Sequence, residues 1–130
     1  HAKNGKVMDA IQLEMWLKDY MEDKIVDGKM KTAKYPMILY NLSNWFGIKG
    51  CHHEAFQMAD LGVDFCVSYE NLAAFPILVS NKGVALAELG EFEEARKYLH
   101  QTITVFEAMK KTDRAQAVID WCSMHYNIKF

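Results

Sequence analysis

The chain has 130 residues, of which 51% are hydrophobic and 25% charged, and these fractions are typical of one ordinary globular domain. Its formal net charge is −2 with no block of like charge, which argues against a nucleic-acid grip or a basic membrane-surface helix in this segment. No apolar run approaches the ~18 residues of a membrane-spanning helix, and no signal-peptide pattern opens the chain. We therefore expect a protein with no membrane partner.

Two further features bear on the setting of the chain. It starts at His1 without an initiator Met, which is typical of an excised piece that carries a short tag remnant. Its three cysteines have no framework spacing, which favours a reducing, cytoplasmic setting. Cys66 lies in an apolar helical run, so we expect it to be a small core residue.

Helical periodicity of apolar residues extends over nearly the whole chain. A first helix is expected from about Val7 to Val26, ended by the turn residues 27–29. No segment alternates at period two for long enough to predict a strand. The five helices expected to follow cover about Ala33 to Ile48, His53 to Tyr69, Leu72 to Leu89, Glu93 to Met109 and Arg114 to Tyr126. These elements predict six antiparallel helices joined by short turns.

The sequence repeats itself with a period of forty residues. When residues 35–69 are laid over 75–109, the identical pairs are Pro36 and Pro76, Asn41 and Asn81, Gly50 and Gly90, Glu54 and Glu94, and Ala55 and Ala95. A fixed period of ~20–50 residues is typical of stacked-repeat proteins. Such proteins mostly bind other molecules along an extended surface, so the repeat favours a binding function over catalysis.

Each repeated residue has a structural reason. The prolines suit the first turn of a helix, where Thr32 and Asn71 are candidate N-caps. The two glycines suit a left-handed residue just after a helix end. The small residues suit close approach of paired helices, and this set comprises Ala55, Ala95 and the like pair Ser43 and Gly83.

The segment from Asn81 to Ala95 resembles the tetratricopeptide repeat, because it combines Asn81 and Gly83 with the turn sequence Gly-Glu-Phe-Glu-Glu-Ala at 90–95. The resemblance implies an all-α fold, a right-handed superhelix of about three helical hairpins. It divides a single domain into a degenerate unit at 1–30, repeats at 31–70 and 71–110, and a capping helix at 111–130. The departures are the missing closing proline, the longer period, His52 in place of the turn aromatic, and Lys82 where a core leucine is usual.

Longer repeats of this kind resemble the C-terminal sensor halves of bacterial helix-turn-helix transcription regulators. This resemblance implies a non-catalytic module that binds a peptide or protein on its concave face, and it leaves a homodimer open. Nucleic acid would be contacted only through a domain that this chain does not contain. The alternatives are a general protein–protein scaffold without a ligand switch and a docking fragment of a larger enzyme.

In this architecture the first helix of each hairpin lines the concave face. The expected lining residues are Met37, Tyr40, Asn41, Asn44 and Ile48 in one unit, and Ile77, Ser80, Asn81, Val84 and Ala87 in the next. We favour Asn44 and Tyr40 for ligand contact. The side chains of Asn41 and Asn81 could bind a peptide backbone or bond the backbone of a neighbouring helix. Since no paired Lys or Arg occupies these positions, a clamp for a carboxylate tail is not expected.

The chemical candidates are weak. Cys51, His52 and His53, with Cys122 and His125 as further donors, are better explained as turn and surface residues than as a zinc site. We expect no metal, no cofactor and no enzymatic activity, because no nucleophile–base pair stands out. Asp60 and Asp64 are expected to be ordinary surface charges. Helical spacing places Trp16, Met58 and Met109 in the core.

Overall fold

The computed structural model describes residues 2–23 and 34–130, and within these residues the secondary structure is entirely helical. The prediction of an all-α chain is therefore confirmed for this part of the protein. The helices are α1 (Ala2–Asp23), α2 (Lys34–Lys49), α3 (His52–Ser68), α4 (Phe75–Glu88), α5 (Phe92–Ala108) and α6 (Thr112–Tyr126).

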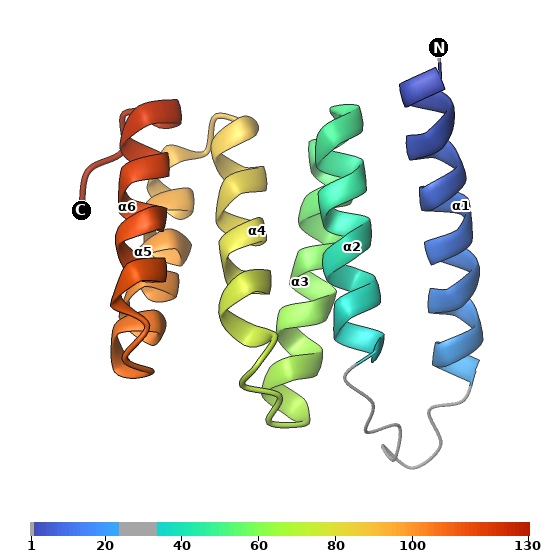
Figure 1. Cartoon of the computed structure of the whole chain (residues 1–130), viewed down its shortest axis with the longest axis horizontal. Coiled ribbons are helices and arrows are strands. Elements are labelled where there is room, and N and C mark those ends of the chain that lie inside the picture. Colours follow the sequence, from blue (N-terminus) through green and yellow to red (C-terminus); the bar gives the residue numbers. More distant parts are fainter. Residues whose placement is uncertain (1, 24–33) are drawn as a thin grey trace.

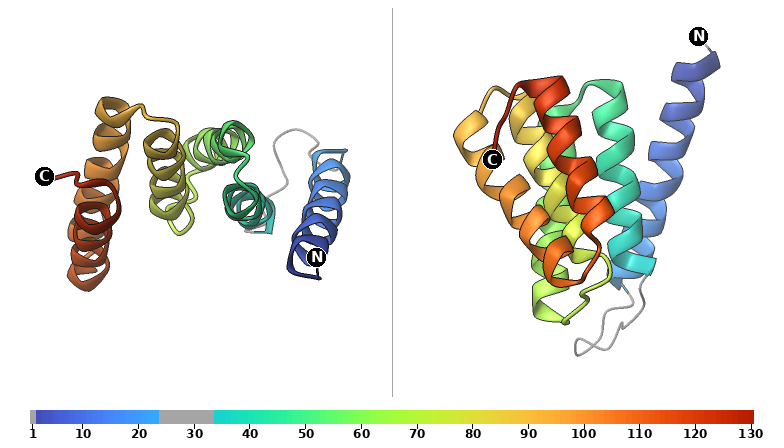
Figure 2. Two further views of the ribbon diagram at one scale, coloured as in Figure 1. Left: turned by 90° about the horizontal axis from the view of Figure 1, so that it is seen from above. Right: turned by 60° about the vertical axis from the view of Figure 1, so that its left-hand side comes forward.

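The helices run alternately up and down and follow one another across the molecule from α1 to α6 (Figure 1). Within the described ranges, each helix packs mainly against the helices next to it in sequence, and α2 also packs against α4. Seen from above, α3 and α5 form a second row behind α2, α4 and α6 (Figure 2, left). The front row of α2, α4 and α6 presents one continuous face.

Four helix ends share one geometry at intervals of twenty residues. The first or second residue after each helix has a positive φ, and the backbone N–H of the residue that follows it bonds the carbonyl five residues earlier. These residues are Gly50 (φ +88°), Glu70 (φ 55°), Gly90 (φ +83°) and Lys110 (φ 60°). This closure satisfies carbonyl groups that a helix end leaves unpaired. The forty-residue repeat is therefore built from two halves with the same length and the same type of ending.

Exchanging residues at these ends should change stability in opposite directions. Gly90→Ala should lower the free energy of unfolding by about 1 kcal/mol, because a Cβ disfavours the left-handed conformation. Lys110→Gly should raise it by up to about 1 kcal/mol for the same reason. Urea denaturation followed by circular dichroism measures both changes. Shifts of equal sign would contradict this account of the helix ends.

The small residues of the repeat lie where paired helices approach most closely. A Cβ built on Gly83 would lie 2.7 Å from Leu99 Cγ and 3.3 Å from the Ala95 carbonyl oxygen. At the equivalent place in the preceding hairpin, the Ser43 hydroxyl donates a hydrogen bond of 2.9 Å to the Ala55 carbonyl. The predicted close approach of α2 to α3 and of α4 to α5 is thus present in both hairpins.

The core lies between neighbouring helices, and Cys66 is buried in it as predicted. Met58 is partly buried and packs against the same core. The prediction of core positions for Trp16 and Met109 is wrong. The Trp16 side chain is 61% exposed and stacks on Tyr20, because α1 packs on α2 through its opposite side, at Val7 and Ile11. Met109 is exposed because it falls on the C-cap of α5.

Two predicted helix starts need correction. The first helix begins at Ala2 rather than Val7, and it includes Gly5, which disfavours a helix but does not end this one. Helix α4 begins at Phe75 rather than Leu72, because the Asn71 side chain accepts a hydrogen bond of 3.1 Å from Ala74 N and closes a separate turn. The Thr32 cap, the end of the first helix at Val26 and the stop at 27–29 lie outside the described residues.

Both prolines lie in the first turn of a helix, Pro36 in α2 and Pro76 in α4, as predicted from their place in the repeat. Across the described residues, no helix combines the length and the apolarity that a bilayer crossing requires.

Candidate binding groove

The face formed by α2, α4 and α6 is hollowed along its length. Four hollows of about 250, 430, 480 and 260 Å³ follow one another along it. Neighbouring hollows share wall residues: Asn44 lines three of them, and Asn81 also lines three. We call this continuous depression the groove.

Most of the predicted lining residues do line the groove. They are Tyr40, Asn41, Asn44, Ile48, Ile77, Ser80, Asn81 and Val84. Met37 is exposed but lines none of the four hollows. Ala87 was expected to line the groove and does not: it is buried against α5 in the same cluster as Ala95. The helical turn carries Ala87 away from the face that Val84 and Asn81 share.

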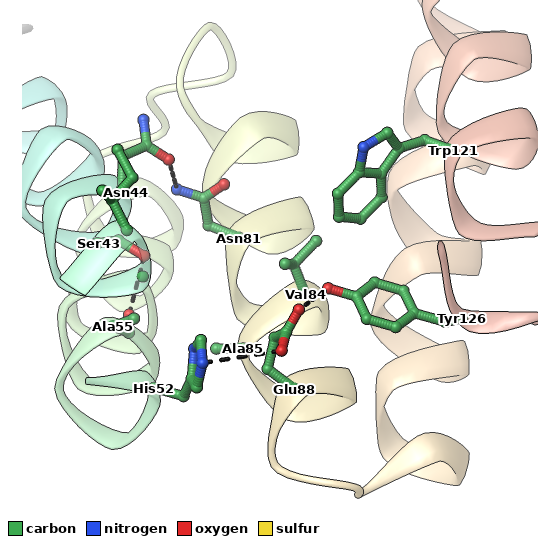
Figure 3. Close-up of a pocket in the computed structure, with 12 residues that line it drawn as sticks. Ser43, Asn44, His52, Ala55, Asn81, Val84, Ala85, Glu88, Trp121 and Tyr126 are labelled. Carbon is green, nitrogen blue, oxygen red and sulfur yellow. Dashed lines mark hydrogen bonds and ion pairs between the residues drawn. The ribbon is translucent and has the colours of Figure 1, made fainter. Parts of the chain in front are cut away.

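A bridge between two asparagine side chains crosses the floor of the groove. Asn81 Nδ2 donates a hydrogen bond of 2.8 Å to Asn44 Oδ1 and so joins α4 to α2 (Figure 3). The bridge uses the NH2 group of Asn81 and the carbonyl oxygen of Asn44. Asn44 Nδ2, a donor, and Asn81 Oδ1, an acceptor, make no other hydrogen bond within the described residues. An extended peptide presents the complementary pair, one C=O and one N–H for each residue.

Asn41 makes a different contact, because its Nδ2 donates to Glu14 Oε1 of α1 over 3.4 Å. In the described residues Asn41 and Asn81 each bond a neighbouring helix, as one of the two interpretations expected, but they bond a side chain of that helix and not its backbone. The cause is that both amides lie opposite a polar side chain, Glu14 or Asn44, on the adjoining helix.

Helix α6 supplies an aromatic wall that sequence reasoning missed. Trp121 and Tyr126 line the hollow drawn in Figure 3, together with Glu88 of α4. The Tyr126 hydroxyl donates a hydrogen bond of 2.5 Å to Glu88 Oε1, and His52 Nε2 lies 3.7 Å from Glu88 Oε2. Burial and the neighbouring Glu88 carboxylate raise the pKa of Tyr126 well above its usual value, so this hydroxyl remains a donor at neutral pH.

The signal for the aromatic wall was present in the repeat. Trp121 follows Asn81 by the same forty residues that separate Asn81 from Asn41. Extending the repeat by one unit into α6 places Trp121 on the groove face. Ala117, which also lines the groove, corresponds in the same way to Ile77.

The candidate metal ligands are dispersed. Cys51 and His52 are half-buried and His53 is exposed, so the expectation of turn and surface positions is met in part. Cys122 is fully buried in the core, where burial raises the pKa of its thiol to about 11, whereas His125 stacks on Trp121 at the surface. Within residues 2–23 and 34–130, no three His, Cys, Asp or Glu side chains converge on a point that could hold a metal ion.

No protein-family model, curated protein or solved structure matches this chain, so the case for a function rests on its residues and their geometry.

Proposed function

We propose that this chain is a non-catalytic module of tetratricopeptide type that binds an extended peptide or protein segment in the groove. The observation that carries the proposal is the Asn44–Asn81 bridge, which leaves one amide donor and one amide acceptor at the centre of a continuous depression. Main-chain groups of a peptide are the common partner for such a pair, and they allow recognition without a fixed side-chain sequence.

The walls of the groove support the same occupant. Ile48, Val84 and Val118 provide apolar surface beside the amides, and Trp121 adds an aromatic face. Binding sites commonly combine apolar walls with a few polar groups that fix orientation. The hollows follow one another along three helices, which suits a chain lying across them better than a compact small molecule.

The proposed role is sensing within a cytoplasmic bacterial transcription regulator, with a DNA-binding domain outside this segment. Within the described residues α6 packs mainly on α5 and meets α4 at fewer points, among them the bond from Tyr126 to Glu88, although both α4 and α6 line the groove. A ligand that contacts both helices would favour one spacing between them, and the helix packing would pass that change along the array. A parent gene without a helix-turn-helix upstream of this segment would contradict the regulatory role and leave a plain scaffold.

Removing either amide should weaken peptide binding. A positional-scanning library of fluorescein-labelled octapeptides, read by fluorescence anisotropy, identifies the tightest sequence. We expect Asn44→Ala and Asn81→Ala each to raise its Kd by about 5–20-fold, because each removes a hydrogen bond to the peptide backbone. The control is Gln101→Ala, an exposed amide on α5 that does not line the groove. Equal Kd values for all three variants, or no binding by any library peptide, would contradict the proposal.

A further inference from the structure

The hollow nearest α1 has an acidic wall. It measures about 480 Å³ and is lined by Glu14, Asn41, Asn44, Trp45 and Ile48. Because Asn44 also lines two further hollows, a peptide main chain held at Asn44 would pass within one side chain's reach of this wall.

The Glu14 carboxylate is incompletely satisfied. Its Oε1 accepts only the 3.4 Å bond from Asn41, and its Oε2 is buried without a hydrogen bond from any described residue. Lys18, one turn along α1, points instead to Glu22, with 3.1 Å between Lys18 Nζ and Glu22 Oε2. With one long hydrogen bond and one unpaired oxygen, the negative charge of this carboxylate is poorly compensated, so a cation in the hollow beside it would be attracted electrostatically.

The surroundings of Glu14 also favour a cation. The Trp45 ring lies in the same wall, and an indole face attracts ammonium and guanidinium groups. Glu88 in the adjoining hollow carries a second carboxylate, which already accepts the hydrogen bond from Tyr126. Among the residues lining the four hollows, the one Lys or Arg side chain is Arg114, which lies in a hollow that neither Glu14 nor Glu88 lines.

We propose that the hollow beside Glu14 receives the basic side chain, Lys or Arg, of the bound peptide, between the Glu14 carboxylate and the Trp45 ring. This inference rests on the proposed function, because the peptide main chain is placed at Asn44 and Asn81. Recognition of the main chain alone gives no sequence preference, whereas the hollow beside Glu14 would select peptides with a basic side chain. The charge selected is thus opposite to that of a carboxylate tail.

The library test has two parts. Wild-type protein should prefer Lys or Arg over norleucine, which has a similar length but no charge, by at least tenfold at one position. In Glu14→Gln that preference should fall to less than threefold, while the Kd of the norleucine peptide stays unchanged. Glu107→Gln, the same change at an exposed residue of α5, should keep the full preference.

The outcomes separate the two proposals. If peptides bind and respond to Asn44→Ala but show no preference for Lys or Arg, the inference about Glu14 fails and the groove stands. If no peptide binds, both fail together. Spermidine is the competitor arm, because its ammonium groups offer the same chemistry without a peptide backbone. Binding of spermidine, sensitive to Glu14→Gln, in the absence of any peptide binding would overturn the peptide as the occupant.

Discussion

Leu99→Ala is expected to lower the free energy of unfolding by about 2–5 kcal/mol, because it removes a fully buried side chain and leaves a cavity. Leu99 is 0% exposed and lies in the cluster that joins α4, α5 and α6. It covers Gly83, since its Cγ lies 2.7 Å from the place that a Cβ on Gly83 would occupy. Urea denaturation monitored by circular dichroism measures the loss.

The same contact provides the control for this prediction. Gly83→Ala alone should cost about 1–3 kcal/mol, because the added methyl group overlaps Leu99. In the Leu99→Ala background the methyl group has room, so Gly83→Ala should then cost little. A double-mutant cycle measures this coupling. Additive effects of the two substitutions would contradict the close packing of α4 on α5 at this point.

Asp60→Ala is expected to cost about 1–3 kcal/mol, because it leaves the charge of Lys82 buried without its partner. The Lys82 residue is 8% exposed, with its Nζ 2.6 Å from Asp60 Oδ1 and 4.2 Å from the centre of the Tyr98 ring. Asp60 was expected to be an ordinary surface charge, and that expectation is wrong. Its side chain is 41% exposed, so solvent screening reduces the effect below that of a fully buried pair.

Two variants test whether losing Asp60 costs more stability than losing Lys82. Lys82→Met removes the buried charge and leaves Asp60 in contact with water, so we expect a change within about 1 kcal/mol. Asp64→Ala, an exposed residue on the same helix, should change stability by less than about 0.5 kcal/mol. If Lys82→Met lowered the free energy of unfolding as much as Asp60→Ala does, the cost could not be assigned to the unpaired buried charge of Lys82.

The pH dependence of the pair has a definite sign. Burial alone would lower the pKa of Lys82, but its hydrogen bonds to Asp60 and Tyr98 outweigh that effect, and the pKa is raised. A raised pKa means that the folded state holds the proton more tightly than the unfolded chain does. The resulting stability is present below the ordinary Lys pKa of about 10.4 and is lost as pH rises through the folded value. Wild-type protein should therefore lose more stability than Lys82→Met above about pH 10.5.

The helices and their endings could be predicted because the repeat has compositional markers. Gly50 and Gly90 mark two helix ends, and the prolines mark two starts. The helix ends before Glu70 and Lys110 were predicted to within one residue, but their left-handed conformation was not, because neither residue type signals it. There the geometry comes from the packing of the helices on each side, which overrides the local preference of the chain.

The groove was predictable only where two copies of the repeat could be compared. Asn44 and Asn81 were identified because they lie on the first helix of a recognised unit, but their mutual bond depends on the distance between α2 and α4. Glu14 was missed as a groove residue because α1 lies outside the clear repeat. Its position on the groove wall follows from the packing of α1 on α2, which no sequence spacing expresses.

The twenty-residue spacing of the four helix ends bears on how the number of helical hairpins can change in evolution. Each helical half ends in the same backbone geometry, and each packs mainly on the halves beside it, within the described residues. If two consecutive helices were duplicated and inserted at one of these helix ends, they would pack against compatible helix surfaces on both sides. The molecule could therefore grow or shorten by whole hairpins, and the length of its groove would vary accordingly.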